Sequence, residues 1–160
     1  MLQEEFFFQG EDDRIFVNGQ QETFVEGILS DEIDIAFIRL FNIPVNPNIL
    51  DDGIQIGSFV DGPFSPALNG KEVMIYSKRL RQGKAAVVNN NSAIFFTGFA
   101  DLLLVDVIQI SPKITEKGDS GGVVLIENDI LLGIIVGADQ KYSYAIPFFK
   151  VNNFKPLTIA

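Results

Sequence analysis

Short apolar segments separated by polar turns run through almost the whole chain, with little of the periodicity of helices. Segments rich in Val, Ile and Phe that are bounded by Gly, Asn and Asp are typical of β-strands. The pattern predicts strands at 6–9, 14–18, 22–29, 34–40, 71–77, 84–89, 92–97, 102–110, 122–127, 130–137 and 142–147. The residues after Pro147 are predicted to form a last strand or a coil. Many short strands joined by polar turns indicate an all-β barrel or sandwich.

The connections divide the chain into two halves. Asn18-Gly19 predicts a tight hairpin, because both residues tolerate positive φ. Asn89-Asn90-Asn91 predicts a second turn. Residues 45–69 hold three of the seven prolines and three glycines and are interrupted only by a predicted strand at 54–60, so they indicate a connector that crosses between two halves.

Composition limits the classes of partner. The length of 160 residues with 47% hydrophobic residues, including 15 Phe, predicts one folded domain or two small packed halves. A net charge of −9 disfavours nucleic acid and anionic membranes as partners. The chain has no Cys and no His, which disfavours disulfides and transition-metal sites, and no cofactor is expected. The acidic N-terminus predicts no signal peptide, no apolar run is long enough to span a membrane, and the compartment is left open.

One motif carries candidate chemistry. In Gly118-Asp119-Ser120-Gly121-Gly122, a hydroxyl stands among residues with little side-chain bulk. A turn of this kind directs backbone N–H groups into one small volume, as an oxyanion hole requires. The plain alternative is an ordinary Gly-Asp-Ser turn between two strands. The motif resembles the nucleophile motif of the trypsin-like serine peptidases.

Further segments resemble the same family. Leu131 to Val136 is similar to the strand that lines the substrate cleft, and Tyr144 to Pro147 is similar to the ending of the HtrA-like branch. Asp34-Ile35-Ala36 resembles the motif of the catalytic aspartate, although such a segment is also an ordinary buried strand. The resemblance implies a double β-barrel in which residues 1–44 are the remnant of a truncated first barrel, 45–69 connect, and 70–160 form a complete second barrel.

The resemblance also implies site residues. Ser120 would be the nucleophile and Asp34 the carboxylate that orients a histidine, while the N–H groups of Gly118 and Ser120 would form the oxyanion hole. The implied substrate pocket is uncharged and would favour small or medium apolar side chains; the alternative is that its residues belong to the core. The pocket residues are Ile114, Val136, Gly137, Ala138 and Ser143.

The catalytic histidine is missing, and the resemblance places its position near Phe7. A serine hydroxyl without a base is a poor nucleophile. Lys113, Lys117 and Lys141 are substitutes only if buried, and the pattern favours solvated surface lysines. The expected function is a catalytically incomplete peptidase domain that binds an extended peptide or protein segment. The alternatives are an active serine endopeptidase completed by a histidine-bearing segment outside this chain, and a non-enzymatic all-β interaction domain.

Two expectations concern Asp119 and the N-terminus. In the trypsin branch the acid at this position pairs with a new N-terminal amine, whereas here Asp119 is expected to cap its own turn. Unpaired strand edges near residues 6–18 predict a homo-oligomer, packing of Phe6, Phe7 and Phe8 on the second barrel, or cover by a missing N-terminal segment.

Overall fold

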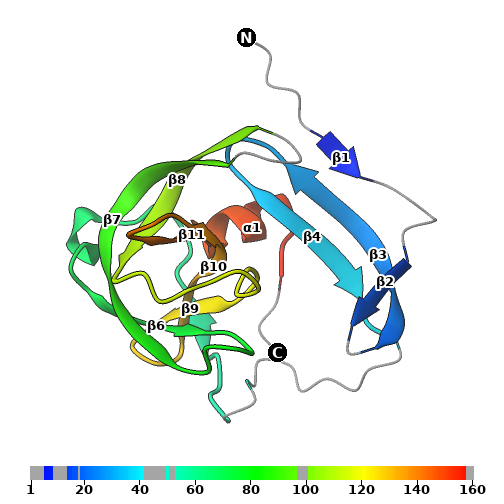
Figure 1. Ribbon diagram of the computed structural model, residues 1–160, viewed down its shortest axis with the longest axis horizontal. Coiled ribbons are helices and arrows are strands. Elements are labelled where there is room, and N and C mark those ends of the chain that lie inside the picture. The colour runs from blue at the N-terminus through cyan, green and yellow to red at the C-terminus, as the bar shows by residue number, and fades with distance from the viewer. Residues whose placement is uncertain are drawn as a thin grey trace.

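The computed structural model describes residues 6–8, 14–17, 19–41, 50, 53–96 and 101–157. Two β-sheets and one short helix make up this part of the chain (Figure 1). The all-β prediction is therefore confirmed except for the helix. No helix among these residues has the length and apolar character that a membrane crossing requires.

The first sheet has four strands around β3. They are β1 (Phe6–Phe8), β2 (Arg14–Val17), β3 (Gln20–Leu29) and β4 (Asp34–Arg39). Strand β3 pairs antiparallel with the other three. Val17 lies opposite Gln20, which leaves a two-residue loop and confirms the hairpin predicted at Asn18-Gly19; Gly19 has a φ of 78°.

The second sheet closes into a barrel-like ring. Its strands are β5 (Ser58–Phe59), β6 (Glu72–Tyr76), β7 (Gly83–Phe96), β8 (Leu102–Ser111), β9 (Val123–Ile126), β10 (Ile130–Ala138) and β11 (Ser143–Pro147). The order is β11-β8-β7-β6-β9-β10-β5, and β10 also pairs with β11, which closes the ring. A 3-10 turn at Pro66–Leu68 lies in the segment that leads from the first sheet to β6.

The hydrophobic core has two parts. One fills the ring and includes Val73, Ile75, Val124 and Leu132. The other packs β-strands of both sheets and the helix together, because Ile28 and Ile33 of the first half join residues of the ring and of α1 (Phe148–Phe154). Apolar burial therefore fixes the first sheet against the ring.

Helix α1 corrects the prediction of a strand or coil after Pro147. Its buried residues Phe148 and Val151 are three apart, which places both on one helix face, and Phe154 stacks on Phe37 of β4 with a centroid distance of 6.1 Å. Figure 1 shows α1 between the ring and the first sheet. Seven residues are too few for a clear helical period in the sequence.

Strand β7 corrects a second prediction. The sequence placed a turn at Asn89-Asn90-Asn91, yet β7 continues through these residues with interrupted register against β8. Side-chain bonds satisfy backbone groups there: Asn91 N donates to the nearby Asn89 Oδ1 at 2.9 Å, and Asn90 N donates at 3.0 Å to Oδ1 of Asn69, 21 residues earlier. Asparagines are turn formers because of such bonds, so bulges within a strand give the same sequence signal. The strand predicted at 54–60 is reduced to β5.

Candidate active site

The turn that carries Ser120 lies in the segment that connects β8 to β9. Gly121 N donates to Ile135 O at 2.8 Å and Ile135 N donates to Gly122 O at 2.7 Å, so the turn is bound to β10. Ser120 is exposed, and its Oγ lies 3.4 Å from the carbonyl oxygen of Val136. The hydroxyl therefore reaches solvent next to the end of β10.

Asp119 is buried beneath this turn, with 1% of its surface exposed. Ser77 Oγ donates to its Oδ1 at 2.6 Å, and Oδ2 accepts from Glu116 N at 2.8 Å and from Arg79 Nε at 2.9 Å. Arg79 Nη2 donates to the same oxygen. Burial alone would raise the pKa of Asp119, but these hydrogen bonds and the Arg79 charge outweigh it and lower the pKa. The expectation that Asp119 caps its own turn is confirmed through Glu116 N.

Arg79 is the residue that the sequence reading missed. It comes from the loop between β6 and β7, and its Nη2 also donates to Ile114 O at 3.1 Å. Arg79 and Asp119 are 40 residues apart along the chain, and arginines in loops are common, so no local sequence pattern indicates that the two residues pair. Its guanidinium supplies the positive partner for Asp119 within the folded chain.

The backbone of the turn leaves two donors available. Among the described residues, neither Gly118 N nor Ser120 N donates to a protein acceptor. Gly118 has a φ of 101°, a conformation that residues with a Cβ rarely adopt. Two backbone donors, on either side of Asp119, are thus available in the turn that carries the Ser120 hydroxyl, and their role as an oxyanion hole stays a prediction.

Asp34 is the first residue of β4, directly after the tight turn 30–33. The residue is exposed, yet protein atoms around its carboxyl remove water and raise the pKa of Asp34. No hydrogen bond joins Asp34 to Ser120 within the described part of the chain. The sequence-predicted pair of Asp34 and Ser120 therefore stays a prediction.

The five predicted pocket residues occupy different environments. Val136, Gly137 and Ala138 lie half-buried at the end of β10. Ile114 packs against the core of the ring, where its Cδ1 approaches Gly83. Ser143 is wholly buried, and its Oγ lies 2.7 Å from Thr115 Oγ1. The end of β10 thus supplies the accessible part of the predicted pocket, and the roles of Ile114 and Ser143 stay predictions.

The turn between β10 and β11 is held by Asp139. Its Oδ1 accepts from the N–H groups of Lys141 and Tyr142 at 2.7 and 2.8 Å, and its Oδ2 accepts from Tyr144 Oη at 2.6 Å. Burial acts to raise the pKa of Asp139, but these bonds outweigh it and lower the pKa. The turn therefore fixes the last residues of β10 with an ionised carboxylate.

The three lysines that could replace a histidine as base are solvated. Lys113, Lys117 and Lys141 are all exposed. A lysine needs burial to become a neutral base near pH 7, so the exposed positions agree with the surface reading from the sequence.

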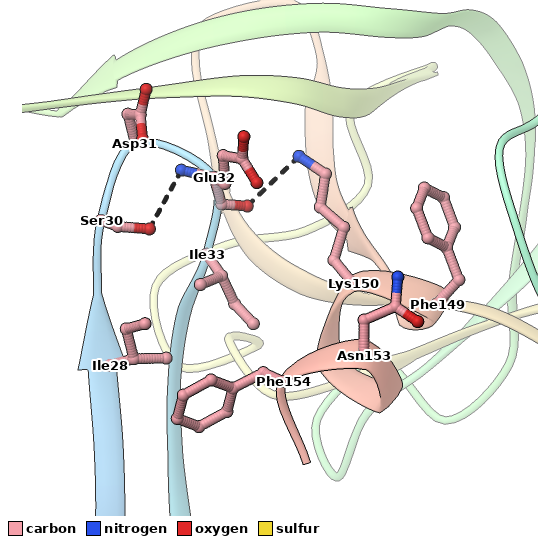
Figure 2. A pocket seen from close by; sticks show the side chains of 9 residues that line it. All are labelled: Ile28, Ser30, Asp31, Glu32, Ile33, Phe149, Lys150, Asn153 and Phe154. Atoms are coloured by element: carbon pink, nitrogen blue, oxygen red, sulfur yellow. Dashed lines mark hydrogen bonds between the residues drawn. The ribbon is translucent and has the colours of Figure 1, made fainter. Parts of the chain in front are cut away.

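Residues of α1 line two pockets in the described part of the chain, and neither pocket includes the turn that carries Ser120. One of about 510 Å³ is bounded by the 30–33 turn and α1 (Figure 2), and one of about 410 Å³ is bounded by Phe64, Asn90 and α1. Lys150 and Phe149 line both. Lys150 Nζ donates to Glu32 O at 3.3 Å and to Val105 O at 3.0 Å, so the lysine links the turn before Asp34 to the ring. Among the described residues, no group of three or more acidic side chains could hold a metal ion.

Comparison with known proteins identifies the fold. No protein-family model and no curated protein matches the chain. A chymotrypsin from Cellulomonas bogoriensis matches with a TM-score of 0.67 and 19% identity, over 88% of this chain and 75% of that one. A glutamic acid-specific serine protease matches with a TM-score of 0.69 and 16% identity, over 89% and 75%. The Nocardiopsis protease NAPase matches with a TM-score of 0.69 and 14% identity, over 95% and 82%.

These matches establish a class of fold. The chain has a chymotrypsin-like protease fold, in agreement with the resemblance that the sequence motifs carry. Identities below 20% extend this similarity to the fold and to no activity. The shared fold sets aside the alternative of an unrelated all-β architecture.

Proposed function

We propose that this chain is a chymotrypsin-fold peptide-binding protein whose nucleophile turn is formed but whose serine lacks a proton acceptor. In this proposal the four-stranded sheet corresponds to the first barrel of the fold and the ring to the second. Ser120 and Asp34 occupy the positions of nucleophile and acid, and Gly118 N and Ser120 N those of the oxyanion hole. The chain contains no histidine, so the proton of Ser120 has no ordinary acceptor.

The open edge of β10 is the observation that carries this proposal. On one side, β10 pairs with β11 from Gly133 to Ala138, with a bulge at Val136. On the other side, pairing with β9 ends at Ile134, and the nucleophile turn takes the backbone of Ile135. Residues 136–138 therefore have no strand neighbour on that side within the described part of the chain. An extended peptide that adds a strand to this edge would pass beside Ser120.

Peptide binding is the direct test. A set of uncharged hexapeptides is titrated into ¹⁵N-labelled protein, and amide shifts are followed. The proposal expects the largest shifts at Gly137, Ala138 and Ser120. The matched control is the same peptide with alternate amides N-methylated, which keeps its side chains but cannot complete a β-ladder, and it should not bind. Equal binding of both peptides, or shifts confined to other strands, would contradict strand addition.

A second function is favoured by the state of the turn. Arg79 keeps Asp119 ionised and buried, and the N–H groups of Gly118 and Ser120 stay free, which is what an active serine peptidase needs apart from its base. This supports the alternative of an active endopeptidase completed by a histidine-bearing segment outside this chain. With the histidine-bearing segment present, reaction of Ser120 with a fluorophosphonate separates the two functions, because only a serine activated by a base reacts quickly.

A further inference from the structure

The side chain of Phe96, at the end of β7, lies against Gly137 of β10. A Cβ built on Gly137 would stand 2.5 Å from Cε1 and 2.8 Å from Cζ of the Phe96 ring. These distances are shorter than any real carbon contact, so the ring fills the space that a side chain at position 137 would take. The absence of a side chain at Gly137 is what admits the ring.

The phenyl ring of Phe96 lies on the face of β10 that turns toward the first sheet. Gly137 is paired with Tyr144 on β11, and directly paired residues of an antiparallel ladder project to the same face. Tyr144 belongs to the core that joins the two sheets, and Phe96 packs against that same core. The phenyl ring of Phe96 therefore covers Gly137, a residue of the open edge of β10, on the face that turns toward the first sheet.

A peptide that pairs with residues 136–138 would continue this sheet. Its alternate side chains would project to the face that holds the Phe96 ring. The neighbouring positions Val136, Gly137 and Ala138 carry no charge and no hydrogen-bonding side chain. A charged side chain placed there would lose water, and the nearby carboxylate of Asp139 is already bonded to Tyr144 Oη and to two backbone N–H groups. An aliphatic or aromatic side chain would instead pack on the phenyl ring of Phe96.

We propose that Phe96 is the specificity-determining residue of this edge and that it selects peptides with a large apolar side chain at the position facing Gly137. The inference rests on the proposed function, because it requires a peptide on β10. It names the class of ligand, a segment with Leu, Ile, Val or Phe at that position. The expected preference over Glu or Lys is on the order of tenfold in Kd, the usual discrimination of a hydrophobic contact.

The neighbouring residue offers a matched control. Phe95 is 57% exposed and lies opposite Leu103, which is 48% exposed, and alternate strand residues face opposite sides. Phe96→Ala and Phe95→Ala remove the same group from adjacent positions, and a Phe96→Leu variant keeps apolar contact if the alanine variant folds poorly. Kd values are measured for peptides that differ only in Leu, Ala, Glu or Lys at each position in turn.

The expected result is a preference for Leu at one position that falls to about twofold or less in Phe96→Ala and is unchanged in Phe95→Ala. In the wild-type complex, the leucine methyl protons should show NOEs to the Phe96 ring. Binding at Gly137 and Ala138 with the same preference in Phe96→Ala, or without these NOEs, would overturn the inference alone. Failure of every peptide to bind the wild-type protein would instead overturn the proposed function.

Discussion

Arg79 holds Asp119 in place through two donors, and Asp119 is the residue directly before Ser120. The arginine is half-exposed while the carboxylate is completely covered. The loop after β6 thereby fixes the shape of the nucleophile turn from inside the same chain. The shape of the turn that carries Ser120 therefore depends on one buried carboxylate.

Asp119→Asn should destabilise the protein, because its single amide oxygen cannot accept from Ser77 Oγ on one side and from Arg79 and Glu116 N on the other. Each buried donor left without a partner costs about 1–3 kcal/mol. Because the pKa of Asp119 is lowered on folding, its contribution is complete above its ordinary value of 3.8 and is lost as the pH falls through the folded value. Urea unfolding at pH 7 and pH 3 should show a smaller loss of stability on acidification in the variant. The exposed Asp61→Asn serves as control, and an equal pH response in wild type and Asp119→Asn would refute the assignment.

Gly122→Ala should disrupt the turn. A Cβ there would meet Asp119 O and Tyr76 O, each at 2.9 Å, and backbone oxygens cannot rotate away. The expected loss is about 1–3 kcal/mol, as for other overpacked sites. Gly57→Ala is the matched control, because its Cβ would approach only the Asp129 carboxylate at 3.2 Å. Thermal unfolding should separate the two variants; similar melting temperatures would show that the turn adjusts freely.

Lys150→Met should loosen the turn that precedes Asp34. It removes donors to Glu32 O and Val105 O, and such bonds from a charged group contribute about 1–3 kcal/mol in total after the cost of burial. Val105 N donates to Asp31 O at 2.7 Å in the same contact, so its amide should exchange with deuterium faster in the variant. The exposed Lys117→Met should leave that amide unchanged. Unchanged exchange in both variants would show that Lys150 does not hold the turn.

Asp34→Asn should slightly stabilise the protein at neutral pH. Burial raises the pKa of Asp34, so its favourable contribution is present below 3.8 and is lost as the pH rises through the raised value. The gain in the variant should be about 0.5 kcal/mol at pH 7 and should vanish near pH 3, since the residue is largely exposed. Asp101→Asn, also exposed, should show no such difference. A gain that is the same at both pH values would contradict a desolvated carboxyl.

Local signals in the sequence predict the strands well, and the nucleophile role of Ser120 stays a prediction. Alternating apolar residues and the Asn18-Gly19 loop are local signals, and the structure has β2 and β3 where they predict a hairpin. The resemblance carried by Gly118 to Gly122 agrees with the fold found by comparison. The asparagines at 89–91 misled because their side chains bind backbone groups equally well in turns and in bulges, as those of Asn89 and Asn90 do here.

What the sequence could not indicate depends on contacts between distant segments. Arg79 and Asp119 are brought together by the ring, and Phe96 reaches Gly137 because the same closed sheet brings the end of β7 to the end of β10. Helix α1 is stabilised by packing of Phe148 and Val151 rather than by its own short sequence. The predicted cover of Phe6, Phe7 and Phe8 concerns side chains outside the described residues, and the homo-oligomer stays a prediction.

The reactivity of Ser120 tests the central claim most directly. The protein is incubated with an excess of fluorophosphonate at pH 7.5 beside Ser120→Ala, and the intact mass is followed for hours. Because its serine has no base, the wild-type protein should form an adduct no faster than Ser120→Ala does. Peptides should still bind at β10. Rapid formation of one adduct that is absent in Ser120→Ala would contradict the account and establish an active serine peptidase.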